Sequence, residues 1–182
     1  INTQDPIYSV SFKANGTDED SVSVFAFDSL GNITHVESYA AGALVGLTRV
    51  NDTAVPADGI LDDLITAGMS DKRQSITYLD VNTQDPIYSV SFKANGTEED
   101  SVSVFAFDLL GNITHVESYA AGALDGLTRV NDAVGSPDGI LDDLIAAGMS
   151  DKRQSITYLD VNTQDPIYSV SFKANGTEED SV

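Results

Sequence analysis

The stretch YLDVNTQDPIYSV occupies Tyr78–Val90 and returns without a change at Tyr158–Val170. Most of it also opens the chain, as INTQDPIYSV. Asn2, Asn82 and Asn162 head the three copies, so the sequence repeats every 80 residues. A fixed period is typical of repeat proteins, in which each unit packs on its neighbours. The quoted stretch therefore predicts the end of one repeat, a short hinge and the first strand of the next.

The two whole repeats, 1–80 and 81–160, differ at ten positions, and five of these lie together at 53–57. Such clustering predicts a surface loop under little constraint. Residues 161–182 repeat 81–102 without a change.

Domain boundaries follow from this period. We expect repeat 1 over residues 1–83, repeat 2 over 84–163, and the first strands of a truncated repeat 3 over 164–182. The sequence begins and ends in the middle of the repeat pattern, so we expect the 182 residues to be an excerpt of a longer array.

The chain carries 29 acidic and 9 basic residues, a formal net charge of −20. A field of this sign repels nucleic acid and anionic membranes, attracts cations and suits a salty medium. The chain has no cysteine, which excludes disulfides and thiolate sites. It also has no apolar run near the ~20 residues of a membrane span.

Four stretches of each repeat have the composition of strands. Ile7–Ala14 alternates apolar and polar residues, and Asn15-Gly16 after it predicts a turn. Residues 21–28 are β-branched and aromatic, as in a central strand, while 33–48 predict a third strand that frays at its glycines and bends into a fourth. Residues 74–81 predict the last strand, and Pro86 then predicts the end of one sheet and the start of the next domain.

The segment DGILDDLITAGMS, which begins at Asp58, predicts one helix of about three turns. Its apolar residues have helical spacing: Ile60, Leu61, Leu64 and Ile65. With five or six strands per repeat, the fold class is mainly β: tandem small β-sandwich repeats (immunoglobulin-like or cadherin-like), each with one short helix.

The repeat junction is the first candidate metal site. Three oxygen-bearing side chains stand within six residues there, and calcium prefers such ligands. The junction residues are Asp80, Asn82 and Asp85, repeated as Asp160, Asn162 and Asp165. Adjacent acidic turns could supply the remaining ligands: Asp18, Asp20, Glu98 and Asp100. The alternative is a polar turn in which the side chains of Asp80 and Asn82 bond local backbone groups.

The sequence DVNTQDP resembles the calcium-binding linker of cadherins. Asp80 and Asn82 match the first two ligand positions, and Pro86 matches the proline. Thr83 and Gln84 stand where that family has an Asp-Asn pair. The resemblance implies calcium between consecutive β-domains.

The second candidate is the loop before the predicted helix. Asp58-Gly59-Ile60-Leu61-Asp62 resembles the back half of the calcium loops of dockerins and thrombospondin type 3 repeats, with Asp52 upstream. The same loop of repeat 2 contributes Asp138 and Asp142. The alternative is an acidic helix N-terminus, which the helix dipole favours without metal.

No constellation for catalysis stands out. His35, repeated as His115, is alone on a predicted strand, with no Ser-His-Asp order, zinc spacing or phosphate loop around it. We therefore expect no enzyme.

In acidity, lack of cysteine and near-identical repeats, the chain resembles the extender regions of bacterial surface adhesins and filaments. The resemblance implies a structural segment of an extracellular or cell-surface fibre, with neighbouring repeats or identical chains as partners. The alternative is a calcium-dependent module that binds carbohydrate or a protein partner through residues 53–57.

If calcium binds at the junctions, it should raise the melting temperature of the chain. If the acidic composition is an adaptation to salt, the melting temperature should depend on ionic strength, with no preference for a divalent cation. Thermal melts with calcium, with magnesium and with chelator at fixed ionic strength separate the two. Equal melting temperatures in all three would remove calcium from the interpretation.

Overall fold

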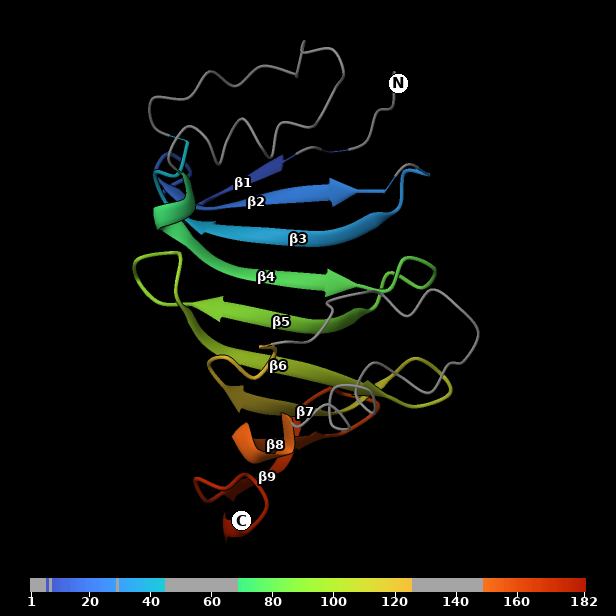
Figure 1. Cartoon of the computed structure of the whole chain (residues 1–182). Helices are drawn as coiled ribbons and strands as arrows, with labels where there is room; N and C mark the ends of the chain where they lie inside the picture. Colours follow the sequence, from blue (N-terminus) through green and yellow to red (C-terminus); the bar gives the residue numbers. More distant parts are fainter. Residues whose placement is uncertain (1–5, 7, 29, 45–68, 126–148) are drawn as a thin grey trace. The chain divides into compact units, whose positions relative to one another are not determined.

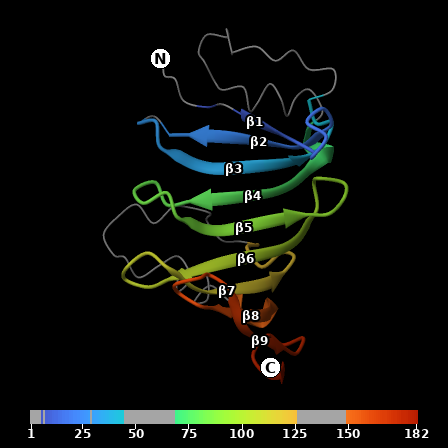
Figure 2. The same cartoon turned by 180° about the vertical axis from the view of Figure 1, so that it is seen from behind.

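The computed structural model describes residues 6, 8–28, 30–44, 69–125 and 149–182. Within them the chain is almost entirely β: ten antiparallel strands form one sheet and follow one another in chain order (Figure 1). The view from behind shows the same succession (Figure 2). The predicted mainly β class is confirmed.

Each whole repeat contributes four of these strands and one 3-10 turn within the described residues. In repeat 1 these elements are β1 Tyr8–Phe12, β2 Glu19–Phe27, β3 Ile33–Ala40, η1 Met69–Lys72 and β4 Arg73–Leu79. In repeat 2 they are β5 Pro86–Phe92, β6 Glu99–Phe107, β7 Ile113–Ala120, η2 Met149–Lys152 and β8 Arg153–Leu159. The last two strands are β9 Pro166–Phe172 and β10 Glu179–Ser181. The strands predicted from the alternating patterns are confirmed.

In the second unit, one face of the sheet is apolar and the other is rich in serine. In β6 the buried residues are Val102 and Val104, which lie opposite Tyr119 and Glu117 of β7. The residues between them form a row of serines that crosses four paired strands: Ser103, Ser118, Ser155 and Ser171. The period of two in the sequence therefore sorts apolar and hydroxyl side chains onto opposite faces.

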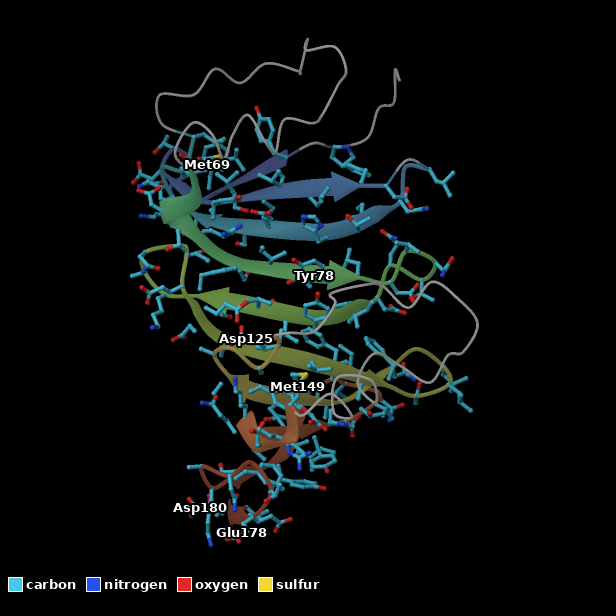
Figure 3. The ribbon with its side chains drawn as sticks, in the orientation of Figure 1. Met69, Tyr78, Asp125, Met149, Glu178 and Asp180 are labelled. Carbon is cyan, nitrogen blue, oxygen red and sulfur yellow. The ribbon has the colours of Figure 1, made fainter. Side chains whose placement is uncertain are left out.

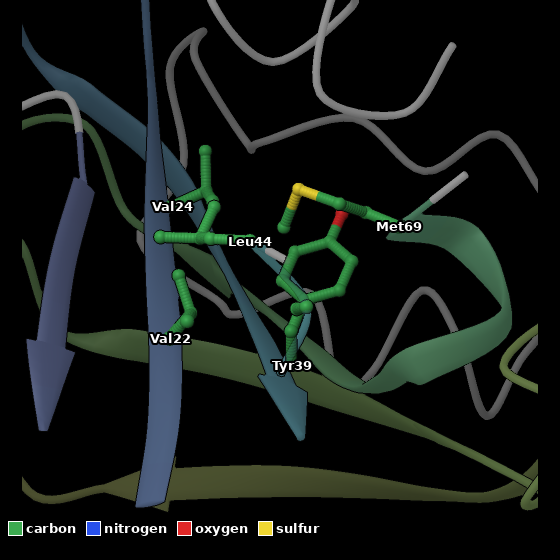
Figure 4. Close-up of a cluster of buried hydrophobic side chains, with 6 residues drawn as sticks. Val22, Val24, Tyr39, Leu44 and Met69 are labelled. Carbon is green, nitrogen blue, oxygen red and sulfur yellow. The ribbon is translucent and has the colours of Figure 1, made fainter. Parts of the chain in front are cut away.

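The chain divides into two compact units, Ile1–Thr77 with Phe92–Glu98, and Tyr78–Ser91 with Glu99–Val182. In the first unit the buried core consists of Val22, Val24, Tyr39, Ala43, Leu44 and Met69 (Figure 4). Tyr8 and Val10 pack against this core. Met69, the first residue of η1, is fully buried and so ties the start of β4 to this core (Figure 3).

The second unit has an equivalent core of its own. Its buried apolar residues are Tyr88, Val90, Val102, Val104, Tyr119, Ala123, Leu124, Met149, Ile156 and Val170. Tyr158 stacks on Tyr168 across the β8–β9 pair with a centroid separation of 4.6 Å, and Tyr78 stacks on Tyr88 in the same way.

The junction stretch at Tyr158–Val170 is a hairpin. β8 pairs antiparallel with β9, with Tyr158 opposite Tyr168 and Leu159 opposite Pro166, so the chain turns back over residues 160–165. The interpretation of the proline as the boundary between two sheets is therefore corrected. Proline is tolerated at the first residue of a strand, and here it opens one in the same sheet.

The finer prediction, tandem sandwiches each with a helix, is not confirmed. The described strands lie in one sheet, and a sandwich needs two. The predicted helix with its residues Ile60, Leu61, Leu64 and Ile65, and the variable loop 53–57, lie outside the described residues.

Gly111, in the turn between β6 and β7, has a backbone φ of 83°, and a Cβ added there would have no heavy atom within 4 Å. Gly111→Ala should therefore destabilise the chain through its left-handed backbone alone, by about 1–2 kcal/mol. Urea unfolding measures this. The matched control is Leu110→Ala, because Leu110 is exposed in the same turn and its truncation should change stability by less than about 0.5 kcal/mol. Equal effects of the two substitutions would contradict the prediction.

Candidate functional site

The junction carboxylates predicted to bind calcium cap the hairpin turn. In the first junction, Oδ1 of Asp80 accepts hydrogen bonds from the backbone N–H of Asn82 at 2.7 Å and of Thr83 at 2.9 Å. In the second junction, Asp160 does the same with Asn162 and Thr163, at 2.8 and 3.1 Å. These hydrogen bonds form the local polar turn that the sequence analysis gives as the alternative to a metal site.

Backbone hydrogen bonds complete each junction turn. The N–H of Asp160 donates to the carbonyl of Asp165 at 2.8 Å, and the N–H of Gln164 donates to the carbonyl of Asp160 at 2.7 Å. Gln164 has a positive φ of 61°, the left-handed conformation that closes the loop. The turn is thus specified by its own side chains and backbone.

The other short turns use the same device. Oδ1 of Asn15 accepts from the N–H of Thr17 and Asp18 between β1 and β2. Oδ1 of Asp28 accepts from the N–H of Leu30 and Asn32 between β2 and β3, and the side-chain amide of Asn32 donates to its Oδ2 at 3.0 Å. The side-chain and backbone hydrogen bonds from Asn32 hold the pKa of Asp28 below its ordinary value.

The turn that holds Glu178, the equivalent of the Asp18 and Glu98 turns in the last piece of the repeat, lies at the other end of β9 from the second junction. Residues 160–165 precede β9, and the turn that holds Glu178 follows it (Figure 3). A strand of seven residues between them spans about 23 Å. The carboxylates of these two turns therefore cannot share one cation, because calcium–oxygen distances are about 2.3–2.6 Å.

The predicted ligands outside the junctions lie in turns and on strands. Asp18 lies in the β1–β2 turn, Asp20 and Asp100 are exposed on β2 and β6, and Glu98 pairs with Lys93 at 3.0 Å. Among the described residues no group of three or more His, Cys, Asp or Glu side chains could hold a metal ion. The other candidates lie outside the described residues: Asp52, Asp58, Asp62, Asp138 and Asp142. Calcium binding stays a prediction.

A buried charged cluster that the sequence did not reveal lies on the apolar face. Glu37 on β3 is only 4% exposed, and its carboxylate accepts a hydrogen bond from the hydroxyl of Tyr39. Nη1 of Arg73, the first residue of β4, lies 3.5 Å from Oε2 of Glu37, and Nε2 of His35 lies 3.8 Å from Oε1. A buried carboxylate is tolerated only where such partners compensate for its lost hydration.

The second repeat has the same cluster. Tyr119 donates to Glu117, Arg153 lies 3.5 Å from the same carboxylate, and His115 lies 3.6 Å from it. Recurrence of one geometry in two repeats identifies it as part of the repeat unit.

The arginine also contacts the first strand of the following repeat. The guanidinium of Arg73 lies over the ring of Phe92, 4.4 Å from its centroid, and Nε donates to the carbonyl of Gly96 at 3.3 Å. In the second unit Arg153 lies over Phe172 at 4.3 Å. We call Glu37, Arg73 and Phe92, and equally Glu117, Arg153 and Phe172, the arginine clamp. Each clamp links two strands of one repeat to the first strand of the next.

Ionisation in the cluster follows from burial. Burial lowers the pKa of His35 and outweighs the opposite effect of Glu37, so the imidazole is less readily protonated than usual. Burial and the hydrogen bond to Glu37 raise the pKa of Tyr39, and the same causes raise that of Tyr119. The two tyrosines are therefore hydrogen-bond donors at neutral pH. The sequence signal for the cluster is HVESY, which places His35, Glu37 and Tyr39 on one face of a strand.

No family model matches the chain, and no curated protein matches it. No helix among the described residues is long and apolar enough to cross a membrane.

Asp160 can act as a cap of the turn or as a calcium ligand, and the two roles predict different stabilities for the variants Asp160→Asn and Asp160→Ala. Asp160→Asn keeps an oxygen that accepts the two N–H groups, so its stability in chelator at neutral pH should match the unsubstituted chain, whereas Asp160→Ala should be less stable. Calcium should stabilise the unsubstituted chain more than Asp160→Asn only if a cation binds there. Thermal melts of the three chains measure this.

These variants should also differ in acid. Hydrogen bonds from the N–H groups of Asn162 and Thr163 hold the pKa of Asp160 below its ordinary value. Its contribution to stability is therefore present above the unfolded-state pKa of about 3.9 and is lost as pH falls through the folded-state pKa. Asp160→Asn should lose less stability between pH 5 and pH 2 than the unsubstituted chain. An equal loss would show that this carboxylate does not couple folding to pH.

Proposed function

We propose that the chain is a non-catalytic structural array, in which each 80-residue repeat extends an antiparallel sheet by four strands. The arginine clamp carries the proposal. It recurs at the same positions of both repeats, and each copy contacts the first strand of the following repeat. In repeat proteins such nearest-neighbour contacts set the stability of the whole array.

In this proposal the tandem repeats continue one sheet in place of separate sandwiches. The hairpin at the second junction supports it, because β8 and β9 pair across the repeat boundary over residues 155–159 and 166–171. Neighbouring strands lie about 4.8 Å apart, so a repeat of four strands adds roughly 19 Å across the sheet. A protein that needs length can obtain it by adding repeats.

We further propose that the array belongs to the outside of a cell, as a segment of a fibre, stalk or adhesin. The chain has 29 acidic and 9 basic residues, and this composition supports the proposal. The net negative charge keeps a repetitive β-protein soluble and repels nucleic acid. Antibodies raised against the chain test it: they should label intact source cells without permeabilisation. Labelling only after permeabilisation would refute the location and leave the array itself untouched.

Arg73→Ala should destabilise the chain by about 3–5 kcal/mol, because it leaves the carboxylate of Glu37 buried without its cation. Replacing both members, as in Glu37→Gln with Arg73→Met, should cost less than Arg73→Ala alone. Denaturant unfolding of the three chains provides the comparison.

The control is the exposed pair of Lys93 and Glu98. Lys93→Ala removes a similar charge contact but should change stability by only about 0–1 kcal/mol. A loss on Arg73→Ala no larger than that on Lys93→Ala would show that the clamp does not hold the repeats together.

A further inference from the structure

The turn after the first strand of each copy of the repeat contains an Asn-Gly bond. These bonds are Asn15-Gly16, Asn95-Gly96 and Asn175-Gly176, and all three asparagines are exposed. Asparagine before glycine is the chemically least stable asparagine, because glycine has no side chain to keep its nitrogen away from the neighbouring amide. Each of these turns is therefore a candidate site of spontaneous deamidation.

Deamidation at such a bond needs only water. The main-chain nitrogen of glycine bonds to the side-chain carbonyl carbon of asparagine, and the bond from that carbon to the amide nitrogen breaks. The amide nitrogen leaves as ammonia and takes with it the proton of the glycine N–H. Water then opens the five-membered ring at one of its two carbonyls, which gives aspartate or isoaspartate.

The folded β5–β6 turn occupies both groups that must react. Oδ1 of Asn95 accepts hydrogen bonds from the backbone N–H of Thr97 and Glu98, both at 3.1 Å. The N–H of Gly96, which supplies the attacking nitrogen, donates to the carbonyl of Lys93 at 2.8 Å. Ring closure turns the side-chain amide toward the glycine nitrogen and removes the proton of that N–H. It therefore breaks these three hydrogen bonds, and the closed turn opposes the reaction.

The β1–β2 turn has the same geometry. Oδ1 of Asn15 accepts from the N–H of Thr17 at 3.1 Å and of Asp18 at 3.0 Å. The N–H of Gly16 donates to the carbonyl of Lys13 at 2.8 Å. The turn between β9 and β10 repeats these bonds at Asn175 and Gly176. The protection is thus a property of the repeat unit.

The first arginine clamp adds a further bond to the turn at Asn95. Nε of Arg73 donates to the carbonyl of Gly96 at 3.3 Å, and Gly96 is buried. Opening of this turn therefore also requires release from the clamp.

We propose that the Asn-Gly bonds are latent modification sites, which the closed hairpin keeps unreactive and which deamidate when the hairpin opens. Local opening of single hairpins is the ordinary way in which a folded chain exposes such groups. Isoaspartate adds one methylene to the main chain and so destroys the cap, whereas aspartate keeps the acceptor oxygen. The reaction therefore leaves a permanent mark on hairpins that have opened. The proposal concerns the chemistry of the turns and does not depend on the location or the role of the array.

The rate of deamidation in the folded and the unfolded chain tests the proposal. The purified full chain is held at mildly alkaline pH in ¹⁸O-labelled water, with and without urea, and a peptide of residues 92–100 gives the rate without tertiary structure. Tryptic peptides that begin after Lys13 and Lys93 report Asn15 and Asn95 separately by the gain of ¹⁸O. We expect Asn95 to react at least about ten-fold more slowly in the folded chain than in urea.

Asn112 is the internal control, because the branched side chain of Ile113 follows it and should keep its rate low in both states. Equal rates at Asn95 in the folded chain and in urea would overturn the proposal.

A substitution in the clamp tests whether single turns open separately. Arg73→Lys keeps a cation beside Glu37 but removes the Nε donor to Gly96, so it should raise the folded-state rate at Asn95 several-fold and leave the rate at Asn15 unchanged. An equal rise at both asparagines, in a chain whose circular dichroism is that of a folded β-protein, would overturn the proposal of local opening.

Discussion

A buried carboxylate is the constraint on which the rest of the repeat depends. Glu37 lies among valines and tyrosines, where an unpaired charge would cost several kcal/mol. Arg73 must therefore reach it, and this requirement fixes the start of β4 beside β3. The same guanidinium lies over Phe92 and so also positions the strand of the next repeat. One charge pair thus aligns strands from two repeats.

Hydrogen bonding in the turns is a second constraint. The chain reverses direction after every strand, and the backbone N–H and C=O groups of each turn need hydrogen-bond partners. Three different turns meet it with one short side chain: Asn15, Asp28 and Asp80 each accept two backbone N–H groups. Part of the acidity of the chain is therefore structural, since aspartate is chosen at these positions for its acceptor oxygen as well as for its charge.

The strands could be predicted from the sequence because alternation of serine with valine, tyrosine and phenylalanine follows the period of a half-buried strand. The hairpin at the junction could not be predicted from the sequence. Pro86 fits the end of a sheet and the first residue of a strand equally well, and only the pairing of the strands distinguishes these two positions. The clamp cannot be predicted from the sequence, because Glu37 and Arg73 are far apart in sequence and a charged residue on a strand normally faces water. The sequence shows Asp80 and Asp160 as members of a polar cluster, but only the backbone geometry shows that they cap the turns.

The order of the strands has a mechanical consequence. Each strand pairs with the next one along the chain, so the chain crosses the sheet step by step from one edge toward the other. Tension along the chain therefore acts across the strands and loads the hydrogen bonds of one strand at a time. Such a sheet lengthens under load by releasing single strands in succession, and it can take them back in the same order when the load falls.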